Sequence, residues 1–271
     1  MLIGKFDPKR HWEKVYQFKK PGEVSWYQVK PAVSLELITL TGIHQAQKII
    51  DVGGGTSVLV DNLLEKGFKN ITVLDISAKA LQYAKERLTE RAEEVTWIEA
   101  DITQFEPLQQ YDLWHDRAVF HFLTNPADRK KYMNAMQKAV KPGGYVIIAT
   151  FDLEGPPKCS GLDVERYNPE KLSNELGSSF NFSKSIEETH ITPRQSQQKF
   201  VYCCFKKALI ELKSVIRCPG CGFKKEETMP TDSCQFFYEC TSCRTLIRPK
   251  PGDCCVFCSY GSVKCPPKQK D

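Results

Sequence analysis

The sequence of 271 residues contains no long hydrophobic run. No stretch approaches the ~18 apolar residues that a membrane-spanning helix requires, so we expect no membrane span. The first residues become charged before an apolar signal-peptide core is complete, so we expect no secretion. The net charge of +5 is too small to indicate a nucleic-acid partner by itself. These absences favour a globular protein of the reducing cytoplasm.

Cysteine, in contrast, is abundant and unevenly distributed. Of the 12 cysteines, only Cys159, Cys203 and Cys204 precede residue 218, and the others lie between Cys218 and Cys265. Thiols this dense in a reducing compartment indicate metal or redox chemistry rather than a disulfide framework. The asymmetry predicts two domains, a larger one at residues 1–207 and a cysteine-rich one at residues 208–271.

A glycine turn follows the first strongly apolar segment of the chain. Residues 48–52 predict a buried strand, and Gly53, Gly54 and Gly55 come directly after it. Three residues without a Cβ allow a sharp turn and the close approach of a ligand to the backbone. A second predicted strand, residues 70–75, ends at Asp75, where a carboxylate suits the two hydroxyls of a ribose.

The charge beside this turn separates two kinds of cofactor. The spacing is not the G-x-G-x-x-G of nicotinamide-dinucleotide enzymes, and Asp51 stands immediately before the glycines. Asp51 would repel a diphosphate, but it would attract a cofactor that carries an amino group and a sulfonium cation. The strings D-V-G-G-G-T-S (51–57) and L-D-I-S (74–77) resemble motifs I and II of class I S-adenosylmethionine-dependent methyltransferases.

That resemblance implies a fold and a set of cofactor contacts. The fold is α/β, a seven-stranded Rossmann-like sheet with a small C-terminal cysteine-rich metal-binding domain. The resemblance implies that S-adenosylmethionine is the cofactor. Asp101 would accept from the adenine amino group and Ile102 would pack on the ring, although Asp101 would also suit a plain loop cap. The residues around the glycine turn and the second strand that it implies as contacts are Asp51, Gly53, Gly54, Gly55, Asp75 and Ile76.

Aromatic side chains are dense near the N-terminus, at Trp12, Tyr16, Trp26 and Tyr27. In the families that this segment resembles, such an arm folds over the cofactor and shields the sulfonium from water. A cation over aromatic faces is also favoured, by about 0.5–2 kcal/mol. The alternative is that these residues belong only to the core.

Candidate catalytic residues follow the fourth predicted strand, residues 111–114. His115, Asp116 and Arg117 stand where an open α/β sheet places its chemistry. His115 is a candidate base and cofactor contact, and Asp116 or Arg117 would orient the substrate. The alternative is that these charges only pin the following loop. The N/D-P-P-Y/F signature of amino-methylating DNA and glutamine enzymes is lacking.

A loop predicted at residues 152–167 carries Cys159. We expect this loop to cover the pocket, where Cys159 is a candidate catalytic thiol that could meet a substrate or metalloid. Lys158 would lower the pKa of this thiol, although a lone cysteine often serves packing alone. Further strands are expected at 95–99, 145–151, 180–190 and 199–205. H-D-R-A-V-F-H-F-L (115–123), K-C-S-G-L (158–162) and H-x-T-P (190–193) resemble a branch of bacterial class I methyltransferases.

Two C-x-x-C pairs begin the cysteine-rich domain. Four thiolates suit the tetrahedral geometry of zinc, and a domain this small needs such a metal for stability. The predicted zinc ligands are Cys218, Cys221, Cys240 and Cys243.

A second cysteine group follows and resembles a module with a G-D-C-C-V-x-C motif. Cys254, Cys255, Cys258 and Cys265 form a candidate second cluster, to which Cys234 can add a ligand. A second zinc site and a reactive Cys255–Cys258 pair both remain open. Soft ions such as mercury(II) or arsenite would prefer these thiols.

Three functional hypotheses follow. The first is methyl transfer to a small soft nucleophile, a thiol or a thiol-bound metalloid, which needs proximity more than a strong base. The second is a protein-lysine methyltransferase whose zinc module recruits the target protein. The third is a non-enzymatic metal- or nucleic-acid-binding protein on the same fold, although the intact set of acids and glycines argues against it. A small-molecule or metalloid partner is therefore expected before a protein partner.

Overall fold

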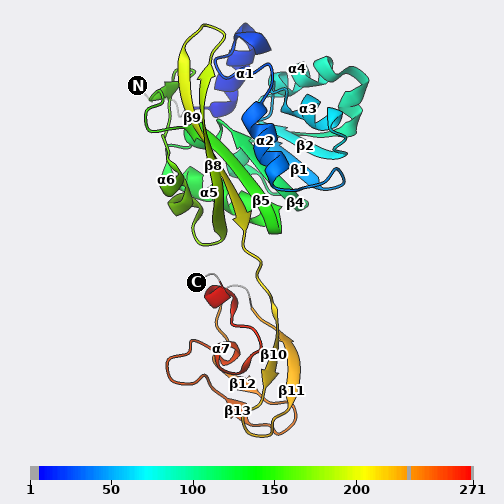
Figure 1. Cartoon of the computed structure of the whole chain (residues 1–271), viewed down its shortest axis with the longest axis vertical. Helices are drawn as coiled ribbons and strands as arrows, with labels where there is room; N and C mark the ends of the chain where they lie inside the picture. The colour runs from blue at the N-terminus through cyan, green and yellow to red at the C-terminus, as the bar shows by residue number, and fades with distance from the viewer. Residues whose placement is uncertain (1–5, 231–232, 270–271) are drawn as a thin grey trace. The chain divides into compact units, whose positions relative to one another are not determined.

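The computed structural model describes residues 6–230 and 233–269, and the chain divides into two compact units, Met1–Lys207 and Ala208–Asp271 (Figure 1). None of the helices in the described ranges is long and apolar enough to cross a membrane.

The first unit is built on the predicted seven-stranded sheet. The strand order is β3-β2-β1-β4-β5-β9-β8, with β1 to β5 parallel and β9 antiparallel to both of its neighbours. This arrangement confirms the Rossmann-like fold class. The strands are β1 (Lys48–Val52), β2 (Asn70–Asp75), β3 (Val95–Glu99), β4 (Tyr111–Arg117), β5 (Val140–Phe151), β8 (Phe180–Ile191) and β9 (Gln197–Lys207).

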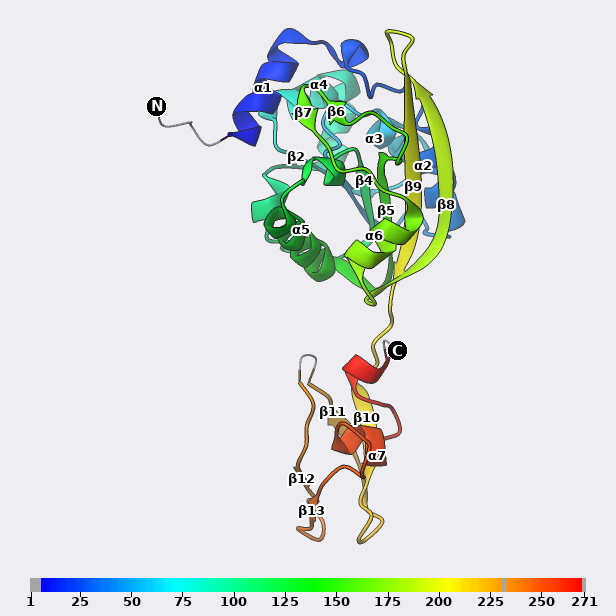
Figure 2. The same ribbon diagram turned by 90° about the vertical axis from the view of Figure 1, so that its left-hand side faces the viewer.

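Helices cover both faces of this sheet (Figures 1 and 2). The helices are α1 (Pro8–Phe18), α2 (Ala32–Leu40), α3 (Leu59–Glu65), α4 (Ala78–Leu88), α5 (Pro126–Ala139) and α6 (Pro169–Leu176). Buried side chains of α2, α3 and α4 form one core with Ile49, whereas those of α5 and α6 form the other with Ile50. Successive strand residues face opposite sides, so continuous apolar strands such as β1 bury both faces.

Strand β4 extends three residues beyond the predicted end, through His115 and Asp116 to Arg117. Asp51 of β1 lies in register with His115, and Val52 lies in register with Asp116. Because neighbouring strand residues face opposite sides, the three candidate catalytic side chains cannot all point into one pocket. The sequence prediction placed them just after the strand end, where this constraint does not apply.

The loop predicted over the pocket contains a short hairpin. Its strands are β6 (Lys158–Cys159) and β7 (Leu162–Asp163). Figure 2 shows this hairpin at the same end of the first unit as α1.

The second unit is made of two small hairpins and a short helix. Strand β10 (Lys213–Arg217) pairs with β11 (Lys224–Thr228), and β12 (Tyr238–Glu239) pairs with β13 (Leu246–Ile247). Each hairpin holds one C-x-x-C pair in its turn. Helix α7 (Val256–Tyr260) follows. The small core contains four cysteines beside Ile216, Met229, Ile247, Val256 and Phe257.

Candidate active site

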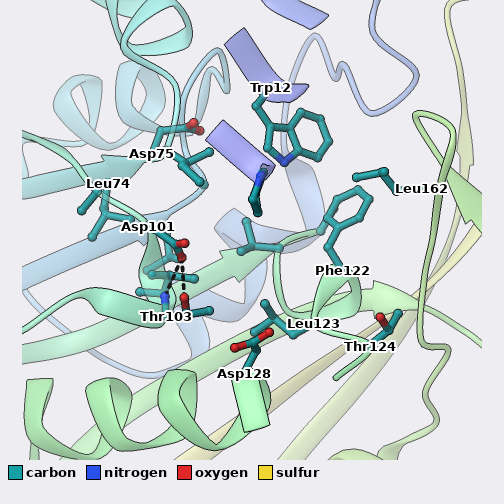
Figure 3. Close-up of a pocket in the computed structure, with 18 of the residues that line it drawn as sticks. Trp12, Leu74, Asp75, Asp101, Thr103, Phe122, Leu123, Thr124, Asp128 and Leu162 are labelled. Carbon is teal, nitrogen blue, oxygen red and sulfur yellow. Dashed lines mark hydrogen bonds between the residues drawn. The ribbon is translucent and has the colours of Figure 1, made fainter. Parts of the chain in front are cut away.

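A cavity of about 790 Å³ lies at the carboxyl ends of β1, β2 and β4, where an open α/β sheet places its ligands. Figure 3 shows Leu74, Asp75 and Asp101 on one side of it, with Phe122 and Leu162 on the other. The cavity brings together most of the predicted site residues. Those among its lining are Trp12, Tyr16, Trp26, Gly53, Asp75, Ile76, Asp101, Ile102, Arg117 and Cys159.

The glycine turn leaves no room for side chains. Gly53 has φ +68°, and a Cβ there would lie 2.0 Å from Cγ2 of Val119. A Cβ at Gly54 would lie 2.4 Å from Oδ2 of Asp51, and one at Gly55 would lie 2.4 Å from Oδ2 of Asp75. Such distances are far inside van der Waals contact, so the turn brings the backbone against both acids only because it consists of glycine.

Asp75 ends β2 with a buried carboxylate that lines the cavity and is 6% exposed. Its Oδ1 accepts a hydrogen bond from the backbone N–H of Ser77 at 2.9 Å. Burial raises the pKa of Asp75 to about 7, although the N–H groups of Ser77 and Gly55 oppose that shift. A carboxylate with this restricted hydration is well suited to ligand hydroxyl groups.

Asp101 lies at the end of the loop that follows β3. Its Oδ1 accepts from both the N–H and the hydroxyl of Thr103, each at 2.8 Å (Figure 3). Ile102 starts the short helix η3 (Ile102–Gln104) and is buried against the cavity. The acid and the apolar side chain therefore stand side by side, and Asp101 also serves as a loop cap.

The N-terminal aromatic residues pack on one another around the cavity. The ring of Trp12 lies 5.7 Å from that of Trp26 and 5.0 Å from that of Phe122, measured between centroids. Tyr16 is buried, and its ring centroid lies 6.3 Å from that of Trp26. These rings thus serve as core and as cavity wall together. Tyr27 lines a smaller neighbouring cavity.

That smaller cavity, of about 40 Å³, adjoins Trp26, Gly53 and Arg117, which also line the large one. Of the two cavities in the described part of the chain, His115 and Asp51 line the smaller one and not the large one. Nδ1 of His115 lies 2.7 Å from Oδ1 of Asp51, and Nε2 lies 2.9 Å from the hydroxyl of Ser34. Both ring nitrogens are therefore engaged, and His115 positions Asp51 rather than facing the large cavity.

Two residues that line this small cavity each have a buried polar atom without a hydrogen-bond partner. Oδ2 of Asp51 is one, and Nη2 of Arg117 is the other. The rest of the Arg117 guanidinium is fixed, because Nε donates to the Tyr202 hydroxyl at 2.7 Å and Nη1 donates to the carbonyl of Trp26 at 2.9 Å. Oδ2 of Asp51 thus remains as an acceptor for a ligand, and Nη2 of Arg117 remains as a donor that lies 3.8 Å from Oε2 of Glu188.

Asp116 lies on the opposite face of β4. Its carboxylate is fully buried and accepts from the N–H of Val119 at 2.9 Å, the N–H of Phe120 at 3.1 Å and the hydroxyl of Tyr132 at 2.7 Å. Burial raises the pKa of Asp116 to about 6. These bonds fix the turn into η4 (Phe120–Phe122), which agrees with the alternative that charges here pin the loop.

Cys159 lines the large cavity and is 4% exposed. Burial raises the pKa of its thiol to about 11. The predicted lowering by Lys158 is wrong, because Nζ of Lys158 pairs with Oδ1 of Asp163 at 2.7 Å and lies on the exposed side of the hairpin. Cys159 is therefore a neutral thiol at neutral pH.

Several residues of the site were not predicted. Ser34, Tyr132 and Tyr202 contact the three predicted catalytic residues of β4, and Glu188 accepts from the Tyr202 hydroxyl at 2.7 Å. They come from α2, α5, β8 and β9, so their approach to β4 depends on tertiary packing. Phe122 could have been predicted as a lining residue, because it lies in the segment 115–123 that the sequence analysis singled out.

The cysteines of the second unit form two groups of sulfur atoms. Cys218, Cys221, Cys240 and Cys243 have their sulfurs within 4.8 Å of one another, as the two C-x-x-C pairs predict. The sulfurs of Cys218 and Cys243 are 3.7 Å apart, and those of Cys221 and Cys240 are 3.8 Å apart. The second group contains Cys234, Cys254, Cys255 and Cys265 within the same limit.

Residues 43–207 match the family model described as "Methyltransferase domain". The chain belongs to this methyltransferase family. It has the class I fold of S-adenosylmethionine-dependent methyltransferases. The family match, and not the fold alone, favours an enzyme over the non-enzymatic hypothesis.

Relatives of this family act on varied substrates. The chain is 30% identical over 104 residues to malonyl-[acyl-carrier protein] O-methyltransferase 2 of Ilyobacter polytropus, covering 38% of this chain and 39% of that protein. It is 24% identical over 162 residues to EEF1A lysine methyltransferase 2 of Danio rerio, covering 54% of this chain and 70% of the relative. Because the chain spans about two fifths of the first relative, that likeness does not fix the methyl acceptor.

A solved methyltransferase shares the fold. It is the N-methyltransferase NodS of Bradyrhizobium japonicum in complex with S-adenosylhomocysteine, with a TM-score of 0.58 at 16% identity over 74% of this chain and 99% of that one. At this identity the likeness establishes the architecture and not the acceptor.

The described residues fit the chemical parts of S-adenosylmethionine. Asp75 matches the ribose hydroxyls, and Asp101 with Ile102 matches an adenine. The unpartnered Oδ2 of Asp51 and Nη2 of Arg117 match the ammonium and carboxylate of an α-amino acid. The rings of Trp12, Tyr16 and Trp26 match a sulfonium cation. When bound, this cofactor supplies an electrophilic methyl group.

Proposed function

We propose that this methyltransferase acts on a small nucleophile that enters the cavity already ionised, a thiol or a metalloid held by thiolates. The observation that carries this proposal is the lack of a free base among the described lining residues. None of these residues is a histidine. A catalytic base would have to be found among the five carboxylates of the lining.

Each of those carboxylates already has a partner. The N–H of Arg10 donates to Asp7, that of Ser77 to Asp75 and that of Thr103 to Asp101, while Lys131 pairs with Asp128 and Lys158 with Asp163. A thiol has an ordinary pKa near 8.5, so a useful fraction is thiolate without help, whereas a lysine amine near 10.4 needs a base. The lining therefore supports the softer, more acidic acceptor.

In this proposal the chain contributes position and exclusion of water. Asp75, Asp101, Asp51 and Arg117 hold the cofactor, the aromatic wall covers its cationic centre, and Phe122 and Leu162 line the side where an acceptor enters. Cys159 contributes a neutral wall atom, His115 orients Asp51, and Asp116 supports the turn at η4.

We also propose zinc at Cys218, Cys221, Cys240 and Cys243. A tetrahedron with zinc–sulfur bonds of ~2.3 Å has sulfur–sulfur edges of ~3.8 Å. The separations of 3.7 and 3.8 Å agree with those edges. The metal would hold the turns of the two hairpins together and supply most of the stability of this unit.

A protein-lysine acceptor is the second candidate. It is favoured by the likeness to EEF1A lysine methyltransferase 2, of which the chain covers 70%. In that case a lysine of another protein would enter the cavity, and one of the lining carboxylates would have to give up its present partner to take the proton of the amine.

An acceptor screen with methyl-labelled cofactor separates these candidates. Small thiols and arsenite with a thiol form one arm, and a cell lysate forms the other. We expect methylated thiol product by mass spectrometry and no labelled protein band. A labelled band without any small product would overturn the proposal in favour of the lysine acceptor.

A further inference from the structure

The second cysteine group contains more sulfur atoms than one tetrahedral site can use. Beyond the four that lie within 4.8 Å of one another, Cys258 places its sulfur 3.4 Å from those of Cys254 and Cys265. Five thiols therefore converge, and zinc accepts four. Helix α7 explains this density, because Cys254 and Cys255 precede it and Cys258 lies within it.

Three of these sulfurs form a tight triangle. The separations are 3.4 Å for Cys254–Cys258, 3.5 Å for Cys254–Cys265 and 3.4 Å for Cys258–Cys265. Cys234 lies further out, 4.0 Å from Cys265. All three edges are shorter than the ~3.8 Å of a zinc tetrahedron and than the 3.7 and 3.8 Å of the first group.

A triangle with short edges fits a three-coordinate ion that carries a lone pair. Such an ion sits above the plane of its ligands, and its bond angles are smaller than tetrahedral. At a similar bond length, smaller angles bring the ligand atoms closer together.

The charge of the complex also favours a trivalent ion with three thiolate ligands. Cys265 is buried in the small core with Val256 and Phe257, whereas Cys258 is half-buried and Cys254 is exposed, so one side of the site is apolar. Three thiolates neutralise a trivalent ion, whereas four thiolates leave a divalent ion with two net negative charges. A neutral complex costs far less to bury in apolar surroundings.

We propose that Cys254, Cys258 and Cys265 form a binding site for trivalent metalloid oxyacids, of which arsenite is the representative. Arsenous acid exchanges its three hydroxyl groups for three cysteine sulfurs. The three thiol protons leave with the hydroxyls as three waters, and arsenic keeps its oxidation state. Cys234 and Cys255 stay outside the triangle. This site does not depend on which acceptor the first unit methylates.

The test uses the full chain, loaded with zinc, reduced with a phosphine and given one equivalent of arsenite. We expect native mass spectrometry and metal analysis to find one zinc and one arsenic per chain. The mass should rise by one arsenic less three hydrogens. Two zinc ions without arsenic uptake, or a mass loss of two hydrogens from a disulfide, would overturn the proposal.

Two matched variants locate the ligands. Cys258→Ser should weaken arsenite binding by on the order of tenfold or more, since even outer partners of metal ligands contribute that much. Cys234→Ser makes the same chemical change at an exposed thiol outside the triangle and should leave the affinity within about twofold. Retained zinc in the first group shows that each variant is folded. Equal loss in both variants, or in neither, would contradict the assignment.

Discussion

At the scale of single residues, the glycine turn makes the sharpest prediction. Gly53→Ala adds a Cβ that meets Val119 at 2.0 Å and forces alanine into φ +68°. Gly42 has φ +74° with nothing within 4 Å of the added Cβ, so Gly42→Ala carries the backbone cost alone. We expect Gly42→Ala to cost about 1 kcal/mol of stability and to keep cofactor binding.

Gly53→Ala should in addition lose cofactor binding by on the order of 100-fold, because Val119 must move into the cavity that it lines. Denaturant unfolding and calorimetry with S-adenosylhomocysteine measure the two effects. If both variants bind equally well, the close contact at Gly53 has no role in the site.

Asp75 predicts a pH dependence. In the proposed site its carboxylate accepts from both ribose hydroxyls more strongly when ionised than when protonated, and burial raises its pKa to about 7 in the free protein. Below pH 7 a proton must leave before binding, so affinity for S-adenosylhomocysteine should fall by up to about tenfold per pH unit. Above that pH the affinity should level off.

The control is Asp75→Asn, which should bind S-adenosylhomocysteine more weakly and should lack the change in affinity near pH 7. Any dependence that this variant retains belongs to groups of the ligand or to other residues. An unchanged step in the variant would show that another group titrates.

Sequence reasoning could predict the position of single residues where a local motif determines the surrounding backbone. Asp51, the glycines and Asp75 follow from a strand, a turn and a second strand, all of which are local patterns. It failed for Cys159, since Lys158 is adjacent in sequence but extends toward Asp163. Neighbours in a strand point to opposite sides, and burial then decides the pKa of the thiol.

At the scale of elements, the extent of β4 decided the roles of three predicted catalytic residues. The apolar run stops at Trp114, but pairing with β1 and β5 carries the strand on to Arg117. His115 then faces Asp51 and Asp116 faces Tyr132. An apolar pattern cannot reveal this, because polar residues at a strand end look like a loop.

Arg117 joins three elements, since it binds the segment after η1 (Pro21–Glu23) through Trp26 and β9 through Tyr202. Lysine keeps the charge but cannot make these bonds together. Arg117→Lys should raise KM for S-adenosylmethionine by on the order of tenfold, with a smaller change in kcat.

Arg166→Lys is the matched control. Arg166 also donates to two backbone carbonyls, of Leu153 and Gly155, but it does not line either cavity in the described chain. In steady-state kinetics, the KM for S-adenosylmethionine should be higher for Arg117→Lys than for Arg166→Lys. Equal KM values would remove Arg117 from cofactor binding.

At the scale of the whole molecule, the uneven cysteine distribution and the compact units point to separate sources of stability. Residues 1–207 bury two apolar cores around one sheet, whereas the small core of the second unit includes four cysteines beside five apolar residues. The spacing of the two C-x-x-C pairs predicted that their four thiols come together. Each pair lies in the turn of a hairpin, so this prediction rests on local structure. The triangle of Cys254, Cys258 and Cys265 depends on how α7 packs, which spacing alone does not determine.

Removal of zinc should therefore affect the two units differently. A strong chelator should make residues 208–271 sensitive to limited proteolysis, since a unit this small cannot fold on apolar burial alone. Residues 1–207 should stay protected and keep their affinity for S-adenosylhomocysteine within about twofold, because that unit has its own core. Proteolysis of both units at the same rate would contradict separate stabilisation.

The most direct test of the account is calorimetry of the full chain with S-adenosylhomocysteine, for the native sequence and for Asp75→Ala. The account predicts one binding site in the native protein and affinity reduced by on the order of 100-fold in the variant, whose carboxylate no longer accepts from the ribose. No binding heat in the native protein, or equal affinity in both, would contradict it.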